Sequence, residues 1–239
     1  MLRSTPLPLG FAAFVGAGLL LERDAGSAGG LALGVLTWLV LLGACARLDR
    51  GERRRVAALV AVATAGEVLG SLILELYAYS HGGIPAFVPP GHGLVYLAGR
   101  RLSRVRRPRL LVAVALAFTF AWGAARMLAG APPDAAGILA AAGLAAVVLR
   151  SPQAALFAAM VLVVDGLELY GTALGTWTWA STWPGLGLSI GNPPLGAALG
   201  YVGFDWVALR IARPSASRTA SCQPLRWAMR SAASSPAST

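Results

Sequence analysis

Residues 56–79 read VAALVAVATAGEVLGSLILELYAY, an apolar run in which Glu67 and Glu75 are the only charged residues. About 20 apolar residues in a helix cross roughly 30 Å of hydrocarbon, so this run predicts a membrane-spanning helix. Similar apolar windows lie on both sides of it, at residues 5–21, 30–46, 86–99, 110–129, 136–149, 153–175 and 192–211. The sequence therefore predicts an all-α, polytopic membrane helix bundle of about eight spans.

The composition of the chain supports this class. Of the 239 residues, 56% are hydrophobic and 13% are charged, whereas soluble domains average about 45–50% and about 25%. The hydrophobicity excludes disorder for most of the chain, and two cysteines exclude a disulfide scaffold. We expect a transmembrane domain over residues 1–211 and a disordered cytoplasmic tail over residues 212–239, which are rich in Ser, Ala and Pro. The first window also fits a cleaved signal peptide.

The distribution of arginine predicts the orientation in the membrane. All 20 cationic residues are Arg, and they cluster between the apolar windows. With a cytoplasmic N-terminus and eight crossings, only Arg23 and Arg126 fall near the outer face. Because positive charge is retained on the cytoplasmic side, we expect a multi-pass protein of the cell membrane with both termini cytoplasmic. The net charge of +10 therefore does not indicate a nucleic-acid partner.

The two halves of the chain share a sequence pattern with an offset near 100 residues. In each half an acidic span ends in an aromatic-x-aromatic triplet, and a double proline follows. The first half has Glu67, Tyr77-Ala78-Tyr79 and Pro89-Pro90, and the second has Asp165, Trp177-Thr178-Trp179 and Pro193-Pro194. Four spans in each half give both halves the same direction. We therefore predict two parallel four-helix repeats, approximately residues 1–109 and 110–211.

Five carboxylates fall within the apolar windows: Glu67, Glu75, Asp165, Glu168 and Asp205. A carboxylate at the bilayer centre costs about 2.5–3.5 kcal/mol on insertion scales, so each is a candidate site residue. Glu67 precedes Tyr79 by 12 residues and Asp165 precedes Trp177 by 12, which places both acids near mid-membrane. Asp165 and Glu168 share one helical face. Structural pairing of the acids with Arg or backbone groups remains an alternative.

The acids and aromatic residues together predict acid catalysis. An apolar environment disfavours a charged carboxylate, so we expect a buried Glu67 facing Asp165 or Glu168 to hold a proton and act as a Brønsted acid. Alkenes of isoprenoids dissolve in the bilayer and react through carbocations, which aromatic faces stabilise. The substrate-binding candidates are Glu75, Tyr77, Tyr79, Trp177 and Trp179. An interfacial aromatic belt is the alternative explanation for these rings.

The sequence contains two histidines, His81 and His92. His92 follows Pro90-Gly91 at the start of a window, where it is a candidate acid–base group. The two histidines lack the helical spacing of metal-binding motifs, and no phosphate-binding loop or nucleophile elbow is found. We therefore predict neither a metal nor a cofactor.

Several of these motifs resemble a membrane carotenoid-biosynthesis family that includes the bacterioruberin-pathway hydratases. They are Gly66-Glu67-Val68-x-Gly70, Tyr77-Ala78-Tyr79 and Ile84-Pro85-x-x-Val88-Pro89, followed by Asp165, Trp177-Thr178-Trp179 and the stretch from Gly191-Asn192 to Gly196. The integral membrane lycopene and terpene cyclases are similar in character. The resemblance covers roughly residues 56–211. It implies hydration or cyclisation of an isoprenoid end group, with Glu67 as the acid, Asp165 as its partner and Asn192 in the site.

Three functions follow from the sequence as hypotheses. The first is a membrane enzyme, a hydratase or cyclase, that acts on a hydrophobic isoprenoid or carotenoid by acid catalysis. The second is a proton-coupled transporter, since repeats and intramembrane acids also suit transport. The third is a non-catalytic scaffold or assembly protein in which the acids pair with arginines.

Overall fold

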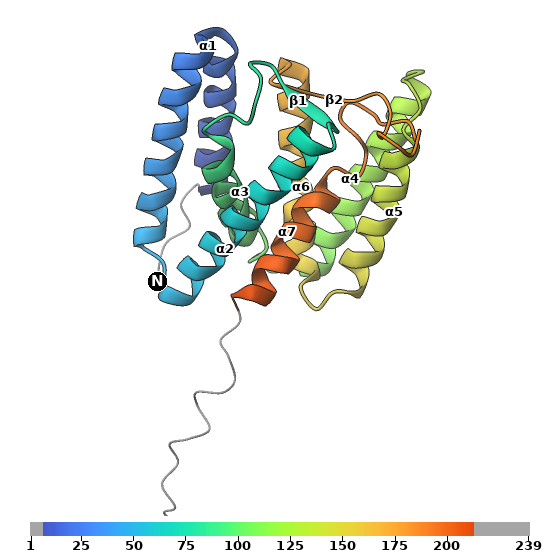
Figure 1. Ribbon diagram of the computed structural model, residues 1–239. Helices are drawn as coiled ribbons and strands as arrows, with labels where there is room; N and C mark the ends of the chain where they lie inside the picture. Colours follow the sequence, from blue (N-terminus) through green and yellow to red (C-terminus); the bar gives the residue numbers. More distant parts are fainter. Residues whose placement is uncertain (1–6, 213–239) are drawn as a thin grey trace, which may run out of the picture.

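The computed structural model describes residues 7–212. Within them the chain forms seven α-helices, one π-helical segment and two short strands (Figure 1). They are, in order, α1 (Leu7–Ala46), α2 (Arg50–Glu67), η1 (Val68–Ile73), β1 (Tyr77–Tyr79), α3 (Val88–Leu102), α4 (Pro108–Leu128), α5 (Ala135–Arg150), α6 (Ala154–Leu174), β2 (Trp177–Trp179) and α7 (Ala198–Ile211). The tail predicted at residues 212–239 lies, apart from its first residue, outside the described part.

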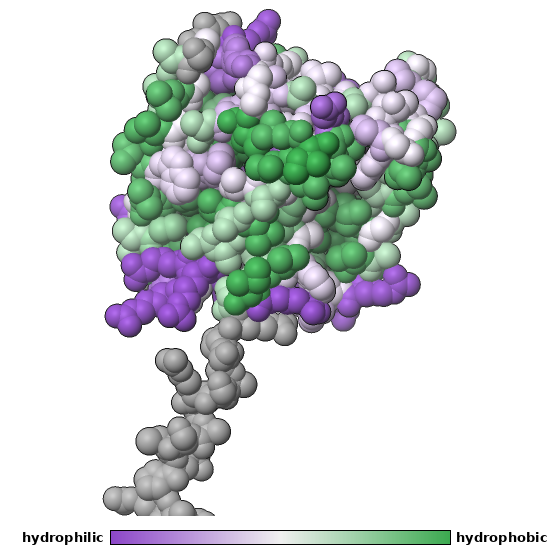
Figure 2. Space-filling view, viewed as in Figure 1, coloured by the Kyte–Doolittle hydropathy of each residue, from purple (hydrophilic) through white to green (hydrophobic). Residues whose placement is uncertain are grey.

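The prediction of a mostly helical protein with membrane-spanning helices is confirmed at this level. Four helical stretches are long and apolar enough to cross a membrane: Ala28–Ala46, Arg50–Ile73, Pro108–Leu128 and Ala154–Leu174. A shorter apolar helix covers Ala135–Arg150. Large hydrophobic side chains are exposed along these helices, and Figure 2 shows hydrophobic residues over much of the visible face. Such a surface suits lipid better than water.

Helix ends follow local sequence signals. In α1 the chain turns at Gly26, whose φ of 61° is left-handed and suits glycine, so that α1 is two arms lying side by side (Figure 1). Asp49 caps α2 by accepting the Glu52 amide at 2.9 Å, and this bond lowers the pKa of the Asp49 carboxyl. Pro89-Pro90 lie in the first turn of α3, where proline is favoured. Pro193-Pro194 instead precede the start of α7.

The main core surrounds α6. Its buried residues Phe157, Met160 and Val164 pack with side chains from α3, α4, α5 and α7. Half of the apolar window of α6 is buried, against 17% for that of α4. A central helix that is apolar on every side is the normal way to bury a core in a bundle. Glu168 and Asp165 therefore belong to a helix that the other helices of the bundle surround.

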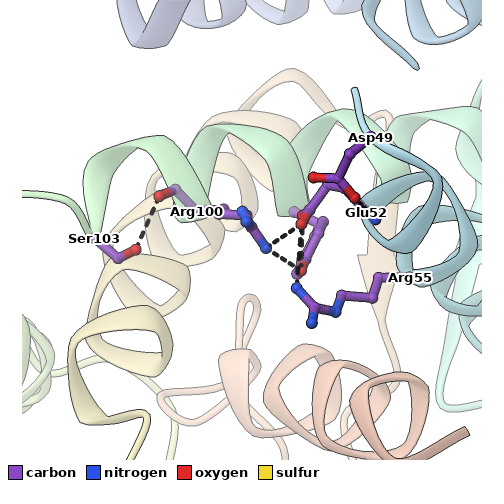
Figure 3. A network of polar contacts seen from close by, with 6 residues as sticks. Asp49, Glu52, Arg55, Arg100 and Ser103 are labelled. Atoms are coloured by element: carbon purple, nitrogen blue, oxygen red, sulfur yellow. Dashed lines mark hydrogen bonds and ion pairs between the residues drawn. The ribbon is translucent and has the colours of Figure 1, made fainter. Parts of the chain in front are cut away.

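Arginines lie in the first turns of α2 and in the last turns of α3, α5 and α7. Figure 1 shows that these helix ends are at the same end of the bundle. The buried Glu52 side chain is the centre of a polar network there, which Figure 3 shows. Its Oε2 accepts from Arg55 at 3.2 Å and also pairs with Arg100, while Oε1 accepts from the Tyr96 hydroxyl at 3.3 Å. This network joins α2 to α3 at the arginine-rich end.

The two strands lie at the opposite end of the bundle (Figure 1) and pair with each other. The pairing is antiparallel, with Tyr77 opposite Trp179, Ala78 opposite Thr178 and Tyr79 opposite Trp177. Since β1 follows η1 and β2 follows α6, the pair joins two segments that are about 100 residues apart in sequence. It brings both aromatic triplets together above the helices.

Candidate functional site

A cavity of about 760 Å³ lies beneath the paired strands. Its walls come from α1, η1, α3, α5, α6 and α7, and they are mostly apolar. The ionisable side chains in its lining include Glu67, Glu168 and His92, together with tyrosines from β1 and α7. An apolar cavity with a few converging polar groups is the usual form of a small-molecule site.

Glu67 is the last residue of α2 and is 4% exposed. Its Oε2 accepts hydrogen bonds from the hydroxyls of Tyr77 at 2.9 Å and Tyr79 at 2.7 Å. Its Oε1 lies 2.9 Å from Nε2 of His92. Three partners therefore hold this carboxylate, and a proton can be shared between its Oε1 and His92.

Glu168 of α6 is also 4% exposed and faces the same cavity. Its Oε2 accepts from the indole Nε1 of Trp177 at 2.9 Å and of Trp179 at 3.0 Å. An indole N–H is only a donor, so an oxygen that accepts from two indoles cannot itself carry a proton toward them. Any proton on Glu168 is therefore on Oε1, for which the described residues provide no hydrogen-bond partner.

A glycine three residues after each of these acids makes room for the aromatic strands. A Cβ at Gly70 would lie 3.1 Å from the ring of Tyr77, and one at Gly171 would lie 2.0 Å from the ring of Trp177. Each acid thus belongs to a Glu-x-x-Gly sequence in which the glycine lets a strand aromatic lie across the helix. The aromatic side chain can then reach back to the carboxylate.

The four aromatic rings of the strands form a continuous cluster. Tyr77 and Trp179 have ring centroids 4.8 Å apart, and Tyr79 and Trp177 have centroids 6.3 Å apart in an edge-on arrangement. All four rings line the cavity. Their hydrogen bonds show that they do more than form an interfacial belt, because they fix the two buried acids.

His92, in the first turns of α3, is 5% exposed. Its ring packs against Tyr201 and Phe204 of α7, with centroids 5.0 and 6.0 Å away. The sequence analysis did not single out either α7 residue. The only available signal was their spacing of three on a helix with aromatic side chains, which is also the ordinary pattern of a core face.

The remaining predicted site residues lie elsewhere. Asp165 accepts from Thr119 of α4 at 2.8 Å and is not part of the cavity lining, so the second acid beside Glu67 is Glu168 rather than Asp165. Glu75 is exposed and has a φ of 50°. Asn192 is also exposed, and its Oδ1 accepts the amide of Trp179 at 3.1 Å. It therefore supports β2 rather than lining the cavity.

A further buried acid, Asp134, holds the chain that leads from β2 to α7. Asp134 caps α5 through the Gly137 amide at 3.0 Å and accepts the amides of Gly191 and Leu195, both at 2.7 Å. Arg126 donates to the Pro193 carbonyl in the same region. These bonds fix the far wall of the cavity, where Ile190 and Pro194 lie.

Within residues 7–212, no group of three or more His, Cys, Asp or Glu side chains is arranged to hold a metal ion. Comparisons with protein-family models, with curated proteins and with solved structures find no match for this chain. The functional argument therefore depends on the geometry of the cavity.

Proposed function

We propose that this protein is an integral membrane enzyme that hydrates or cyclises an isoprenoid or carotenoid through a carbocation. The observation that carries the proposal is the pair of buried carboxylates, Glu67 and Glu168, on one apolar cavity beneath four aromatic rings. The hydrophobic walls suit a lipid-soluble polyene. The resemblance of the sequence motifs to membrane carotenoid-biosynthesis proteins supports the same substrate class.

Glu168 is the proposed acid. Its Oε1 transfers a proton to the less substituted carbon of a trisubstituted isoprenoid alkene, which forms a C–H bond and leaves a tertiary carbocation on the neighbouring carbon. The resulting carboxylate remains bonded to Trp177 and Trp179. Cation–π contacts contribute about 0.5–2 kcal/mol each, so the aromatic cluster lowers the energy of the cation at the place where it forms.

Glu67 and His92 are the proposed base. In hydration, a water oxygen bonds to the cation and one water proton passes to this pair. In cyclisation, the cation is attacked by a second alkene, and the pair removes a proton from carbon to restore a double bond. Either way one proton leaves Glu168 and one is taken up by Glu67–His92, so that return of that proton to Glu168 completes the cycle.

For the membrane arrangement we propose eight crossings with both termini cytoplasmic. Counting the two arms of α1 separately and α2 with η1 as one span, the helices of Figure 1 run alternately up and down, and each predicted window overlaps one of them. The Arg-rich connections at one end agree with this orientation. We count the short helices α3 and α7 among the eight crossings because the aromatic strands and the cavity cover their outer ends.

We also propose that the two halves are parallel repeats about an axis along the membrane normal. The strand pairing supports this, because Ala78 and Thr178 oppose each other and the outer residues of the triplets exchange places. A two-fold axis through the middle pair produces this register. The two Glu-x-x-Gly sequences, with their aromatic donors, give equivalent contacts on the two sides of the axis.

The proposal is tested by expressing the protein in a lycopene-producing host and analysing the pigments by chromatography and mass spectrometry. We expect a product that carries an added water or has the mass of an isomer. Glu168→Gln should abolish this product, while Glu75→Gln, which changes an exposed acid outside the cavity, should leave it. Unchanged pigments with lycopene and with shorter linear isoprenoids would overturn the proposal.

A proton-coupled transporter is the second candidate, and the buried Glu67–His92 pair favours it because such pairs load and release protons in carriers. Vesicles containing the purified protein distinguish the two functions. A solute or proton flux that Glu67→Gln abolishes, without any chemical change of the solute, would establish transport instead of catalysis.

A further inference from the structure

A polar stripe runs along α3 from the cavity to the arginine-rich end. His92, Tyr96 and Arg100 follow one another at intervals of four residues, so they lie on one face of the helix. His92 contacts Glu67 at 2.9 Å, and the Tyr96 hydroxyl lies 3.3 Å from Glu52 and 3.4 Å from Arg100. The stripe therefore begins at the proposed base and ends in the network of Figure 3.

Asp205 of α7 lies beside the middle of this stripe. It is 1% exposed, and neither carboxylate oxygen has a hydrogen-bond partner among the described residues. Tyr201, one turn before it, packs on His92, and Ala208, one turn after it, belongs to the same buried cluster as Tyr96.

Burying the Asp205 carboxylate without hydrogen-bond partners is unfavourable. A buried polar group that lacks such partners costs several kcal/mol of free energy relative to the same group in water. Buried water satisfies such groups and makes about three hydrogen bonds when it does so. The carboxylate of Asp205, the Tyr96 hydroxyl and the ring of His92 are polar groups of the kind that such water needs. The apolar neighbours Phe204 and Ala208 supply none.

From this placement we infer that Asp205 binds water, and that water reaches the site from the arginine-rich end along the polar stripe of α3, where α3 and α7 both pack on α2. This use of the path rests on the proposed function. Hydration consumes one water for each alkene, with a C–O bond formed and one O–H bond broken, and the released proton passes to His92 and Glu67.

The test uses D2O as the probe and no substrate. In a chain with Cys45→Ala and Cys222→Ala, the Asp205→Cys variant places a thiol at the inferred water site, and Val202→Cys places one a turn away, at a 1% exposed position in the apolar core. The purified full-length variants are reconstituted in lipid, and exchange of S–H for S–D is followed by infrared spectroscopy. Amide circular dichroism of both variants checks the fold.

We expect the Asp205→Cys thiol to exchange about tenfold or more faster than the Val202→Cys thiol, because exchange requires contact with solvent. A further substitution in the Asp205→Cys variant, Tyr96→Leu, should slow the exchange of the thiol because it removes the polar group in the middle of the path. Equal exchange of the two thiols would overturn the inference, whatever the outcome of the pigment assay.

If the path is present but no hydrated pigment forms in the lycopene host, the proposed function fails while the water site stands.

Discussion

Glu67 and Glu168 occupy matching places beneath the strand pair, but their partners differ. Glu67 is held by two tyrosine hydroxyls and a histidine, all of which can both give and accept hydrogen bonds or protons. Glu168 is held by two indoles, which only donate. The geometry is shared, and the chemistry of the partners is not.

This difference is the basis of the roles proposed for the two acids. A proton on Glu168 has no exit through Trp177 or Trp179 and is available at Oε1, on the cavity side. A proton that reaches Glu67 can move on to His92, which lies on the stripe leading to the arginine-rich end. Under the proposed repeat, a change of Tyr to Trp or the reverse in one copy of the carboxylate-and-aromatic unit would be enough to separate an acid from a base.

The largest expected effect tests this assignment directly. Glu168→Gln keeps an oxygen that accepts the indole N–H groups but removes the proton, so we expect product formation to fall by about a hundred- to ten-thousandfold. No cation forms, and no by-products should appear. Quantification of all pigments by mass spectrometry checks this, with Glu75→Gln as the control.

The same assay on the other acid should give a different outcome. In Glu67→Gln or His92→Gln, the cation still forms but its capture lacks a base, so we expect a smaller loss, about ten- to a hundredfold, with a changed ratio of hydrated to dehydrated products. If Glu67→Gln abolishes all products and Glu168→Gln only shifts their ratio, the two roles are reversed.

The helices were predictable from the sequence because length and apolarity alone decide which segments enter a bilayer. The windows at residues 110–129 and 153–175, for example, nearly coincide with α4 and α6. The buried position of Glu67 and its place near the aromatic triplet also followed from the sequence. These features depend on local composition, which each segment carries by itself.

The partner of Glu67 was not predictable by counting residues. Tyr79 follows Glu67 by 12 residues and Trp177 follows Asp165 by 12, but this compares the second aromatic of one strand with the first of the other. In the structure Tyr77 follows Glu67 by ten residues and Trp177 follows Glu168 by nine. The additional residue is accommodated by η1, because a π-helical turn holds one residue more than an α-helical turn.

The contacts of α7 were equally hidden from the sequence. Tyr201 and Phe204 meet His92 only because α3 and α7 approach each other in the folded bundle, and no local pattern encodes that approach. The strand pairing is a similar case, since three-residue strands are too short to give a periodic signal. Contacts between distant segments required the structure.

Gly70 and Gly171 allow the two halves to be compared through the free energy of unfolding. Alanine favours a helix over glycine by about 1 kcal/mol, but a Cβ at Gly171 would lie 2.0 Å from the Trp177 ring. We expect Gly171→Ala to lower the free energy of unfolding by about 1–3 kcal/mol through overpacking. Gly70→Ala, with its contact at 3.1 Å, should be close to neutral because the Tyr77 ring can shift slightly.

Thermal unfolding of both glycine variants in detergent, followed by tryptophan fluorescence, measures this difference. The fluorescence also reports whether Trp177 has moved. A Gly171→Ala protein that is as stable as the wild type would mean that the Trp177 ring does not lie across α6 and that Glu168 is not held by it.

The smallest expected effect concerns a single hydroxyl. Tyr79→Phe removes the 2.7 Å bond to Glu67 but leaves the ring and the bonds from Tyr77 and His92, so we expect a loss of about 1 kcal/mol in the free energy of unfolding. Trp179→Phe removes one of the two donors to Glu168 together with part of a half-buried ring, and it should cost more. Denaturant titration of both proteins compares them. Equal costs would mean that the two carboxylates tolerate the loss of a donor equally. The difference between Glu67, which has three partners, and Glu168, which has two, would then not affect the free energy of unfolding.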